Sequence, residues 1–214
     1  MNRELGRVLV LSPHVDDGEL GCGGTIARFV EEGEEVHYLA LSAAEKSVPK
    51  GFPKVALRKE VLKAIGVLGV PPKNISVLNF ETRDFPAHRQ EILDTLIELR
   101  KDINPSSVLT PSLKDLHQDH HVTTNEALRA FRKTASTILG YEQPWNCITF
   151  DTLMFVVLNE KHVNLKIKAL EKYESQKARE YLNPEFIRSL ARIRGVPVGE
   201  KYAEAFEVMR WVLR

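Results

Sequence analysis

Over roughly the first 135 residues, short runs of consecutive apolar residues alternate with stretches in which apolar residues recur every three or four positions. A uniformly apolar run is typical of a strand buried on both faces, as in a parallel sheet. Such runs predict strands at 8–11, 36–41, 75–78 and 108–110. The periodic stretches predict helices at Thr25–Glu32, Val55–Leu68, Glu91–Leu99 and Val122–Lys133. This alternation predicts an α/β fold with a mostly parallel sheet and helices on both of its faces.

The pattern changes after about residue 140. Strands are predicted at Ile148–Phe150 and Leu153–Leu158, and a helix at Val163–Tyr173 is followed by a second, polar helix. The segment Tyr202–Leu213 fits either a final helix or a strand. Because no repeat, low-complexity tract or linker interrupts the chain, we expect a single domain over residues 1–214.

Composition narrows the class of protein. The 214 residues carry 30 Lys and Arg against 29 Asp and Glu, and a net charge of +1 argues against binding nucleic acid through bulk electrostatics. Two cysteines cannot form a disulfide framework, and no apolar run is long enough to span a membrane. Since no leader sequence is apparent either, we expect a cytoplasmic protein.

Residues with reactive side chains gather in two segments, each directly after a predicted strand. Pro13–Asp17 (Pro-His-Val-Asp-Asp) follows the first strand, and Asp115–His121 (Asp-Leu-His-Gln-Asp-His-His) follows the fourth. Ligands of open α/β sheets bind beyond the carboxyl ends of the strands, where the direction of winding reverses. If the first and fourth strands are neighbours there, the two segments share one crevice.

Histidine and aspartate without thiolates suit Zn²⁺ or a similar divalent ion. His14 and Asp17 are three residues apart, and His120 would complete a three-ligand set that leaves a position for water. Asp16 would stay off the metal and act as general base on the zinc-bound water. His117, as an imidazolium, would stabilise an oxyanion or protonate a leaving amine.

Simpler interpretations of the same residues stay open. Asp16 or Asp17 would also suit the N-cap of the following helix. His120 or His121 would also suit the start of a helix, and His121 is left unassigned. The remaining histidines are interpreted as structural: His37, His88 and His162.

The glycines at positions 21, 23 and 24 resemble part of a dinucleotide-binding fingerprint, but their spacing is not Gly-x-Gly-x-x-Gly. Asp16 and Asp17 precede them and would repel a pyrophosphate. Close packing of a helix against a strand is therefore the preferred interpretation of these glycines.

Together these motifs resemble the PIG-L / LmbE-like family of zinc-dependent N-acetylglucosamine deacetylases. Pro13–Leu20 and Gly23–Ala27 are similar to the family's His-Pro-Asp-Asp-Glu and Gly-Gly-Thr pattern, and His117–His120 to its His-x-Asp-His motif. The resemblance covers roughly the first 135 residues. The chain departs from the pattern at Val15 and Gln118, and at Gly18, where an acidic residue is common.

The resemblance implies a Rossmann-like three-layer sandwich and a role for each matching residue. The zinc ligands would be His14, Asp17 and His120. The catalytic residues would be Asp16 as general base and His117 as electrophile or acid, with Asp119 orienting His117. Arg58 would bind substrate, although its spacing to Glu60 is one residue short, and Asp84 would accept a sugar hydroxyl. A solvated helix residue at Arg58 and a turn former at Asp84 are the alternatives.

Further segments resemble the family beyond the core motifs. Lys168–Gln176 is similar to its Tyr-x-Ser-Gln segment and Tyr202–Phe206 to its Ala-Glu-x-Phe segment, which leaves the roles of Tyr173, Gln176 and Glu204 open between cleft lining and packing. The aromatic, polar segment Leu139–Asn146 is interpreted as a loop that either stacks on a sugar or closes over the core.

The function expected from the resemblance is zinc-dependent removal of the acetyl group from an N-acetylglucosamine-type sugar in a glycoconjugate or oligosaccharide. The alternatives are a metal-dependent amidase of another sugar or thiol conjugate, a phosphoesterase, and a non-catalytic carbohydrate-binding module. A phosphoesterase is disfavoured because the motifs supply acidic groups and few cations. The partner would be a small molecule or glycan, with no nucleic acid and no membrane span, and a homo-oligomer stays possible.

Overall fold

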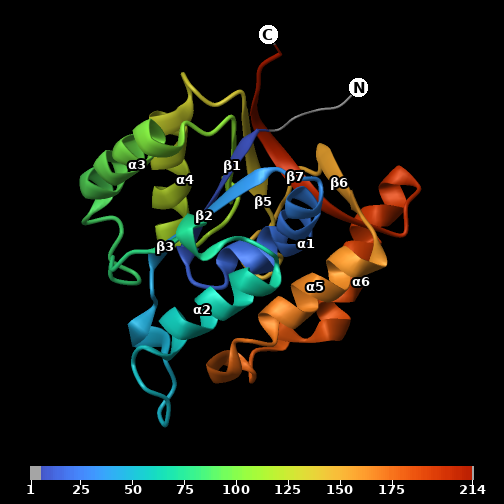
Figure 1. Ribbon diagram of the computed structural model, residues 1–214, viewed down its shortest axis with the longest axis horizontal. Coiled ribbons are helices and arrows are strands. Elements are labelled where there is room, and N and C mark those ends of the chain that lie inside the picture. Colours follow the sequence, from blue (N-terminus) through green and yellow to red (C-terminus); the bar gives the residue numbers. More distant parts are fainter. Residues whose placement is uncertain (1–5, 214) are drawn as a thin grey trace.

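The computed structural model describes residues 6–213 (Figure 1). Its strands are β1 (Arg7–His14), β2 (Glu35–Ser42), β3 (Ile75–Val77), β4 (Ser107–Pro111), β5 (Thr137–Tyr141), β6 (Met154–Leu158) and β7 (Tyr202–Trp211). Its α-helices are α1 (Asp17–Glu31), α2 (Ala56–Val67), α3 (Arg89–Ile103), α4 (Gln118–Phe131), α5 (Glu160–Leu170) and α6 (Pro184–Gly195). Within these residues, no helix has the length and apolar character needed to cross a membrane.

The strands form one sheet with the order β3-β2-β1-β4-β5-β7-β6. The pairs within β1 to β5 are parallel, whereas β7 runs antiparallel to both of its neighbours, β5 and β6. β1 lies between β2 and β4, so the winding reverses there and the ends of β1 and β4 meet at a switch point. The predicted α/β fold with a mostly parallel sheet is confirmed.

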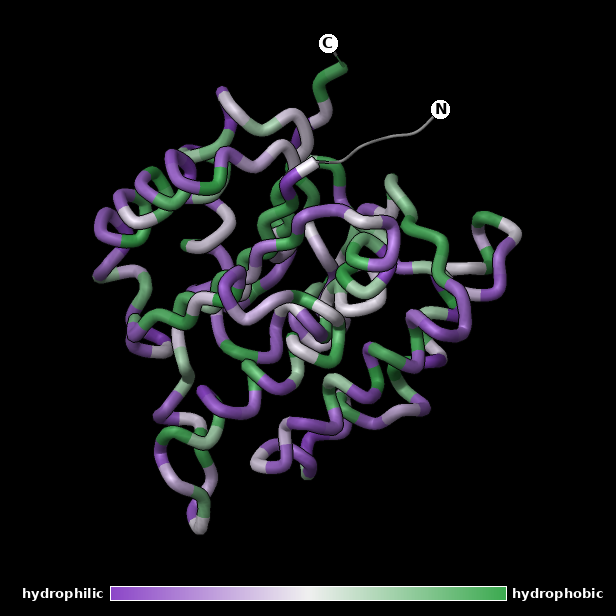
Figure 2. Tube along the Cα trace, in the orientation of Figure 1, coloured by the Kyte–Doolittle hydropathy of each residue, from purple (hydrophilic) through white to green (hydrophobic). Residues whose placement is uncertain are grey.

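Helices cover both faces of the sheet, with α1, α2, α5 and α6 on one face and α3 and α4 on the other (Figure 1). Successive residues of β1 point to opposite faces: Val8 and Val10 belong to the first apolar cluster, Leu9 and Leu11 to the second. Both faces of β1 are therefore buried, which explains its continuous apolar run. Hydrophobic and hydrophilic residues alternate along the outer helices instead (Figure 2).

The structure corrects two predictions near residue 140. Thr137–Tyr141 is strand β5, so the predicted loop begins only after Tyr141. Gly140 interrupts the apolar pattern of this strand, because a Cβ there would lie 2.9 Å from Ser112 Cα. Ile148–Phe150 is not a strand, and the side chain of Ile148 is 83% exposed. The prediction of a strand at Ile148–Phe150 is therefore wrong, because this short segment is not buried.

Helix α1 begins at Asp17, eight residues before the predicted start, and is broken at Cys22 (φ −142°, ψ 27°). The break frees the backbone N–H groups of Gly24 and Thr25, which donate to the Glu204 carboxylate of β7 at 3.0 and 2.6 Å. A Cβ at Gly21 would lie 2.1 Å from the ring of Tyr141. The glycine-rich segment therefore serves close packing, as the sequence favoured.

Candidate metal and catalytic site

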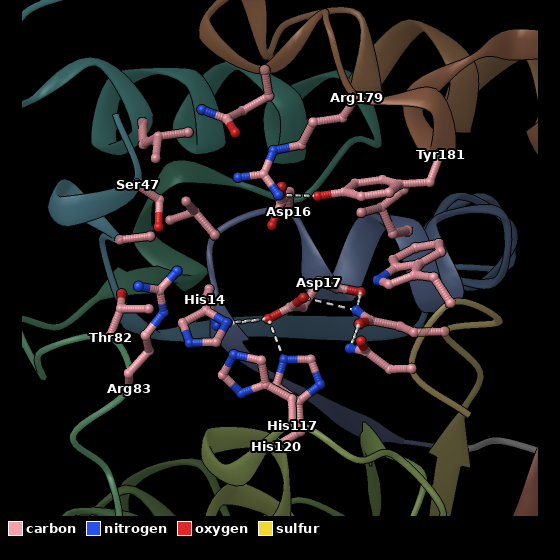
Figure 3. Close-up of a pocket in the computed structure, with 18 residues that line it drawn as sticks. His14, Asp16, Asp17, Ser47, Thr82, Arg83, His117, His120, Arg179 and Tyr181 are labelled. Carbon is pink, nitrogen blue, oxygen red and sulfur yellow. Dashed lines mark hydrogen bonds and ion pairs between the residues drawn. The ribbon is translucent and has the colours of Figure 1, made fainter. Parts of the chain in front are cut away.

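The two segments that follow β1 and β4 line one cavity of about 280 Å³ at the switch point (Figure 3). The β1–α1 junction contributes His14, Val15, Asp16 and Asp17, and the start of α4 contributes His117 and His120. Helix α4 begins at Gln118, four residues before its predicted start, so His120 lies in its first turn. The shared crevice expected from the motif positions is present.

His14, Asp17 and His120 have donor atoms that converge on one point. Asp17 Oδ2 lies 3.0 Å from His14 Nδ1 and 3.2 Å from His120 Nε2. Donors of a tetrahedral zinc site, with bonds near 2.1 Å, are about 3.4 Å apart. All three residues are buried, with exposed fractions of 8%, 6% and 1%. The three donor atoms lie within 4.8 Å of one another, so this nitrogen and oxygen set could hold a divalent ion such as Zn²⁺.

Carboxylates lie behind both histidines of this group. His14 Nε2 is 2.8 Å from Asp119 Oδ2, and His120 Nδ1 is 2.7 Å from Asp115 Oδ2. Each contact fixes the ring orientation and leaves the other ring nitrogen facing Asp17, the arrangement found around metal-binding histidines. Burial by itself lowers the pKa of His120, but Asp17 and Asp115 outweigh it and raise that pKa to about 10. Asp17 and Asp115 therefore favour a positive charge at the position of His120.

A second group, His14, His117 and Asp119, also has donor atoms close enough for one ion. In that group the Asp119 carboxylate already accepts the backbone N–H groups of Arg83 and Phe85, at 2.6 and 3.3 Å. His117 is only half-buried, and among residues 6–213 no carboxylate forms a hydrogen bond with its ring. We therefore assign Asp119 to the support of His14 and favour the first group.

The contacts of Asp119 differ from those expected of a residue that orients His117 through its side chain. Its carboxylate contacts His14, whereas its backbone N–H donates to His117 Nδ1 at 3.1 Å. His117 is thus oriented by the first turn of α4 and not by the Asp119 side chain. Because Nδ1 accepts this bond, the neutral ring carries its hydrogen on Nε2. Burial and the two neighbouring histidines also lower the pKa of His117, which disfavours the expected imidazolium.

Asp16 occupies the N-cap position of α1, yet its side chain makes no capping hydrogen bond. Its backbone is left-handed (φ 86°), a conformation that non-glycine residues adopt at a cost of about 1–3 kcal/mol. The carboxylate lines the cavity beside the metal group (Figure 3). Burial, followed by the carboxylates of Asp17 and Glu19, raises the pKa of Asp16 well above its usual range. The simple helix-cap interpretation of Asp16 therefore fails.

The two predicted substrate-binding residues do not line the cavity. The Arg58 guanidinium donates to the carbonyls of Val77 and Leu78 and so supports the end of β3. Successive residues of a helix are rotated by about 100°, and Leu57 faces the cavity instead. Asp84 contacts the exposed ring of His88 at 3.2 Å. The alternative, structural interpretation of both residues fits their contacts.

Sequence reasoning missed several residues that the fold brings to the site. Gln143 donates from Nε2 to Asp17 Oδ1 at 2.8 Å, and Trp145 stacks on Tyr181 at a centroid distance of 4.2 Å. Arg83 and Arg179 also line the cavity. Asp115 belonged to the recognised His/Asp segment, but nothing in the sequence told it apart from a loop residue. Gln143 and Trp145 belong to the segment Leu139–Asn146 that the sequence marked as aromatic and polar, without a role for either residue. Arg83 and Arg179 had no local signal, because tertiary packing alone brings them to the cavity.

The structure shows the surroundings of the three residues whose roles the sequence left open, Tyr173, Gln176 and Glu204. Glu204 caps the second half of α1 and pairs with Lys166 Nζ at 2.6 Å. The Tyr173 hydroxyl donates to the buried Glu19 carboxylate, behind the β1–α1 junction. Gln176 lines the cavity. Glu204 and Tyr173 therefore support the site from outside it.

The histidines interpreted as structural have partners on the surface or at helix ends. His37 contacts Glu35 at 2.9 Å, and His88 contacts Asp84 and Glu91. His162 forms a capping box with Asn159 at the start of α5. None of them lines the cavity, and His121 does not line it either.

The chain is similar in sequence and in structure to several known proteins. The chain is 29% identical over 175 residues to the uncharacterised deacetylase YaiS of Escherichia coli, covering 78% of this chain and 90% of that protein. N,N′-diacetylchitobiose deacetylase from Pyrococcus horikoshii, solved with an inhibitor, superposes with a TM-score of 0.79 at 25% identity, covering 95% and 83%. The 4-oxalmesaconate hydratase of Pseudomonas putida is 30% identical over 132 residues, 56% of this chain and 49% of that enzyme.

A family model described as PIG-L, GlcNAc-PI de-N-acetylase, matches residues 9–131, which is more than half of the chain. This match includes both the His-Val-Asp-Asp segment after β1 and the His-Gln-Asp-His segment at the start of α4. The chain therefore belongs to the PIG-L family of deacetylases, enzymes that hydrolyse amide bonds.

Proposed function

We propose that this protein is a zinc-dependent hydrolase that removes the N-acetyl group from an N-acetylglucosamine-type amino sugar in a conjugate or oligosaccharide. The observation that carries the proposal is the convergence of His14, Asp17 and His120 next to a carboxylate, Asp16, that is not used as a helix cap. The diacetylchitobiose deacetylase relative supports the choice of an N-acetylated sugar as substrate.

His14, Asp17 and His120 would hold the ion. When bound, zinc would polarise the amide carbonyl and activate a water molecule for attack. Asp16 accepts the proton of the attacking water and passes it to the nitrogen of the breaking C–N bond, so that acetate and a free amine leave. His117 donates a hydrogen bond from Nε2 to the amide oxygen as negative charge develops there.

Hydrogen bonds from neighbouring side chains hold the proposed metal ligands in place. The ligand histidines are held by Asp115 and Asp119, so little reorganisation is needed when an ion binds. Gln143 holds the second oxygen of Asp17. The three proposed metal ligands are therefore held before an ion or a substrate arrives, which is how preorganisation lowers a barrier.

The test is release of acetate and free amine from a panel of N-acetylhexosamine conjugates, with metal content measured on the same samples. We expect turnover that is lost with chelator and restored by added Zn²⁺. A protein that binds no metal, or that turns over equally well with chelator, would contradict the proposal. Ligand binding without metal dependence or turnover would favour a carbohydrate-binding module instead.

The same panel separates related chemistries. A thiol conjugate of an acylated amine tests the wider amidase alternative, and mass spectrometry of the products shows whether the acetyl group is lost.

A further inference from the structure

The two oxygens of the Asp17 carboxylate are held by different groups (Figure 3). Oδ2 accepts the backbone N–H of His14 at 2.8 Å and lies 3.0 and 3.2 Å from the ring nitrogens His14 Nδ1 and His120 Nε2. Oδ1 accepts a hydrogen bond from Gln143 Nε2 at 2.8 Å. The amide of Gln143 therefore occupies the oxygen of Asp17 that the histidines leave over.

The side-chain torsions of an aspartate do not fix both of its oxygens. The terminal torsion is broad and roughly two-fold, so a bond to one oxygen leaves the other able to swing toward an ion. In Asp115 one oxygen is held by the backbone N–H of His117 at 2.8 Å, and in Asp119 one is held by that of Phe85 at 3.3 Å. For Oδ1 of Asp17 the donor is instead a side chain, which a substitution can remove without changing the backbone.

The amide of Gln143 is oriented at both of its ends. A carboxylate only accepts hydrogen bonds, so the nitrogen of the amide must face Asp17. The amide oxygen, Oε1, accepts Asn146 Nδ2 at 3.2 Å, and this nitrogen also lies 3.4 Å from Asp115 Oδ2. Because Gln143 is only 1% exposed, it has little contact with solvent that could replace these bonds.

These contacts close a ring of side chains that joins a candidate ligand, its support and the turn after β5. The members of the ring, in order, are Asp17, His120, Asp115, Asn146 and Gln143. The turn is itself fixed to the segment before α4, because the N–H of Leu116 donates to the Asn146 carbonyl at 3.1 Å. Gln143 therefore approaches Asp17 from a rigid base.

The number of oxygens that Asp17 offers to an ion decides which coordination the site allows. A catalytic zinc site has three protein ligands and keeps a fourth position for water. Ions that prefer more oxygen ligands, such as Ca²⁺, take both oxygens of a carboxylate in many sites. A second oxygen from Asp17 would compete for the position of the water. The hydrogen bond from Gln143 opposes this without adding a charge, since an amide is neutral.

We propose that Gln143 is a positioning residue, which restricts Asp17 to one oxygen toward the ion and so keeps a coordination position open for water. Asn146 holds the amide of Gln143 in the orientation that this role requires. The inference rests on the metal site of the proposed function, and it extends that function to a residue outside the two His/Asp segments.

The first experiment uses Co²⁺ as a spectroscopic probe in place of Zn²⁺. Four-coordinate Co²⁺ absorbs visible light much more strongly than five- or six-coordinate Co²⁺, so the intensity of its bands reports the coordination geometry. We expect an intense spectrum in the wild type and a several-fold weaker one in Gln143→Met, which removes the amide at a similar side-chain volume. Asn146→Ala should weaken the spectrum by a smaller factor, because it only releases the orientation of the amide.

The second experiment measures competition between Zn²⁺ and Mn²⁺. Because Mn²⁺ favours oxygen ligands and octahedral sites, Gln143→Met should lower the ratio of Zn²⁺ to Mn²⁺ affinity by about 10-fold, the lower end of the effect of groups behind metal ligands. Gln90→Met is the matched control, since Gln90 Nε2 donates to Asp94 Oδ1 at the same distance of 2.8 Å, but on the exposed surface of α3. The control should change neither the ratio nor the Co²⁺ spectrum.

Thermal unfolding of the metal-free proteins separates positioning from a loss of fold, and we expect Gln143→Met to unfold near the temperature of the wild type. A wild-type spectrum and affinity ratio in Gln143→Met would overturn the role of Gln143. An equal loss of affinity for both ions, together with a lower unfolding temperature, would show a structural role alone and overturn it too.

The outcomes also distinguish this inference from the proposed function. If the spectra and the affinity ratio change as expected but no conjugate releases acetate, the deacetylase proposal fails and the positioning role stands. If acetate is released but Gln143→Met keeps the wild-type spectrum and ratio, only the positioning role fails. A wild type that binds neither Co²⁺ nor Zn²⁺ contradicts both.

Discussion

At the scale of single residues, four aspartates around one cavity have distinct contacts. Asp17 places one oxygen near both His14 and His120, and Asp115 and Asp119 lie behind these rings. Asp16 contacts none of the histidines and is left facing the cavity. The type of residue is the same in each case, so only the contacts distinguish the proposed roles of ligand, support and base.

Asp16→Asn should separate catalysis from metal binding. We expect kcat to fall by about 10²- to 10⁴-fold, the usual contribution of a general base, while one zinc per chain is retained. Acetate release and metal analysis provide the measurement. Asp17→Asn is the control and should lose the metal. Turnover near that of the wild type in Asp16→Asn would remove Asp16 from the base role.

Asp115→Asn should weaken metal binding without touching a ligand. The variant can still accept a hydrogen bond from His120 but lacks the charge that increases the basicity of the ring, so we expect zinc affinity to fall about 10- to 100-fold. A chelator competition titration measures this, with the exposed Asp102→Asn as control. Unchanged affinity would mean that Asp115 only stabilises the fold.

At the scale of elements, helix α1 depends on a residue almost 180 positions away. The break at Cys22 leaves backbone N–H groups that Glu204 of β7 satisfies, and Glu204 in turn pairs with Lys166 of α5. Since both charged side chains are buried, with 6% side-chain exposure each, the pair joins three elements behind the catalytic segment.

Glu204→Gln should destabilise the protein by about 3–5 kcal/mol, because Lys166 is left as an uncompensated buried charge. Urea unfolding at saturating zinc measures the loss. The double variant Lys166→Met with Glu204→Gln should recover much of the stability, and the exposed Glu200→Gln should change it little. Equal stability of the single and double variants would show that the charge on Lys166 is tolerated.

Two glycine substitutions should have opposite effects. In Gly21→Ala the new Cβ meets the buried ring of Tyr141, so we expect a loss of about 1–3 kcal/mol. In Gly66→Ala, on the exposed side of α2, no atom lies within 4 Å of the new Cβ, and removing glycine from a helix should add about 0.5–1 kcal/mol. Thermal unfolding of the pair tests both, and a stable Gly21→Ala would contradict the packing role.

At the scale of the whole molecule, the site exists because the sheet order places the ends of β1 and β4 side by side. The cavity therefore gathers several buried carboxylates and histidines whose charges an ion would balance. Metal binding and folding should be linked for this reason.

Adding zinc to the chelated protein should raise the melting temperature in a saturable way. At a free zinc concentration of 100 times Kd the stabilisation is about 2.7 kcal/mol, which for a domain of this size corresponds to roughly 5–10 °C. Differential scanning calorimetry measures it, and Asp17→Asn should abolish the shift. A shift that persists in Asp17→Asn would place the ion elsewhere.

Much of the architecture was predictable from local pattern. Runs such as Val8–Leu11 report burial on both faces of a strand, and reactive residues directly after strands report the edge of a parallel sheet where ligands bind. The resemblance of the two His/Asp segments to known motifs extended this to a ligand set. Strand β5 was missed because its apolar run is only Ile138 and Leu139 before Gly140, although tertiary packing buries the strand.

The remaining features of the site depend on contacts between segments that are distant in sequence. Whether Asp119 supports His14 or His117, and whether Arg58 or Leu57 faces the cavity, depend on helix rotation and on the approach of loops far apart in sequence. Local propensity and hydrophobic periodicity carry no information about these approaches. The chemical type of the site was therefore encoded in short motifs, whereas the assignment of its supporting residues came from the tertiary structure.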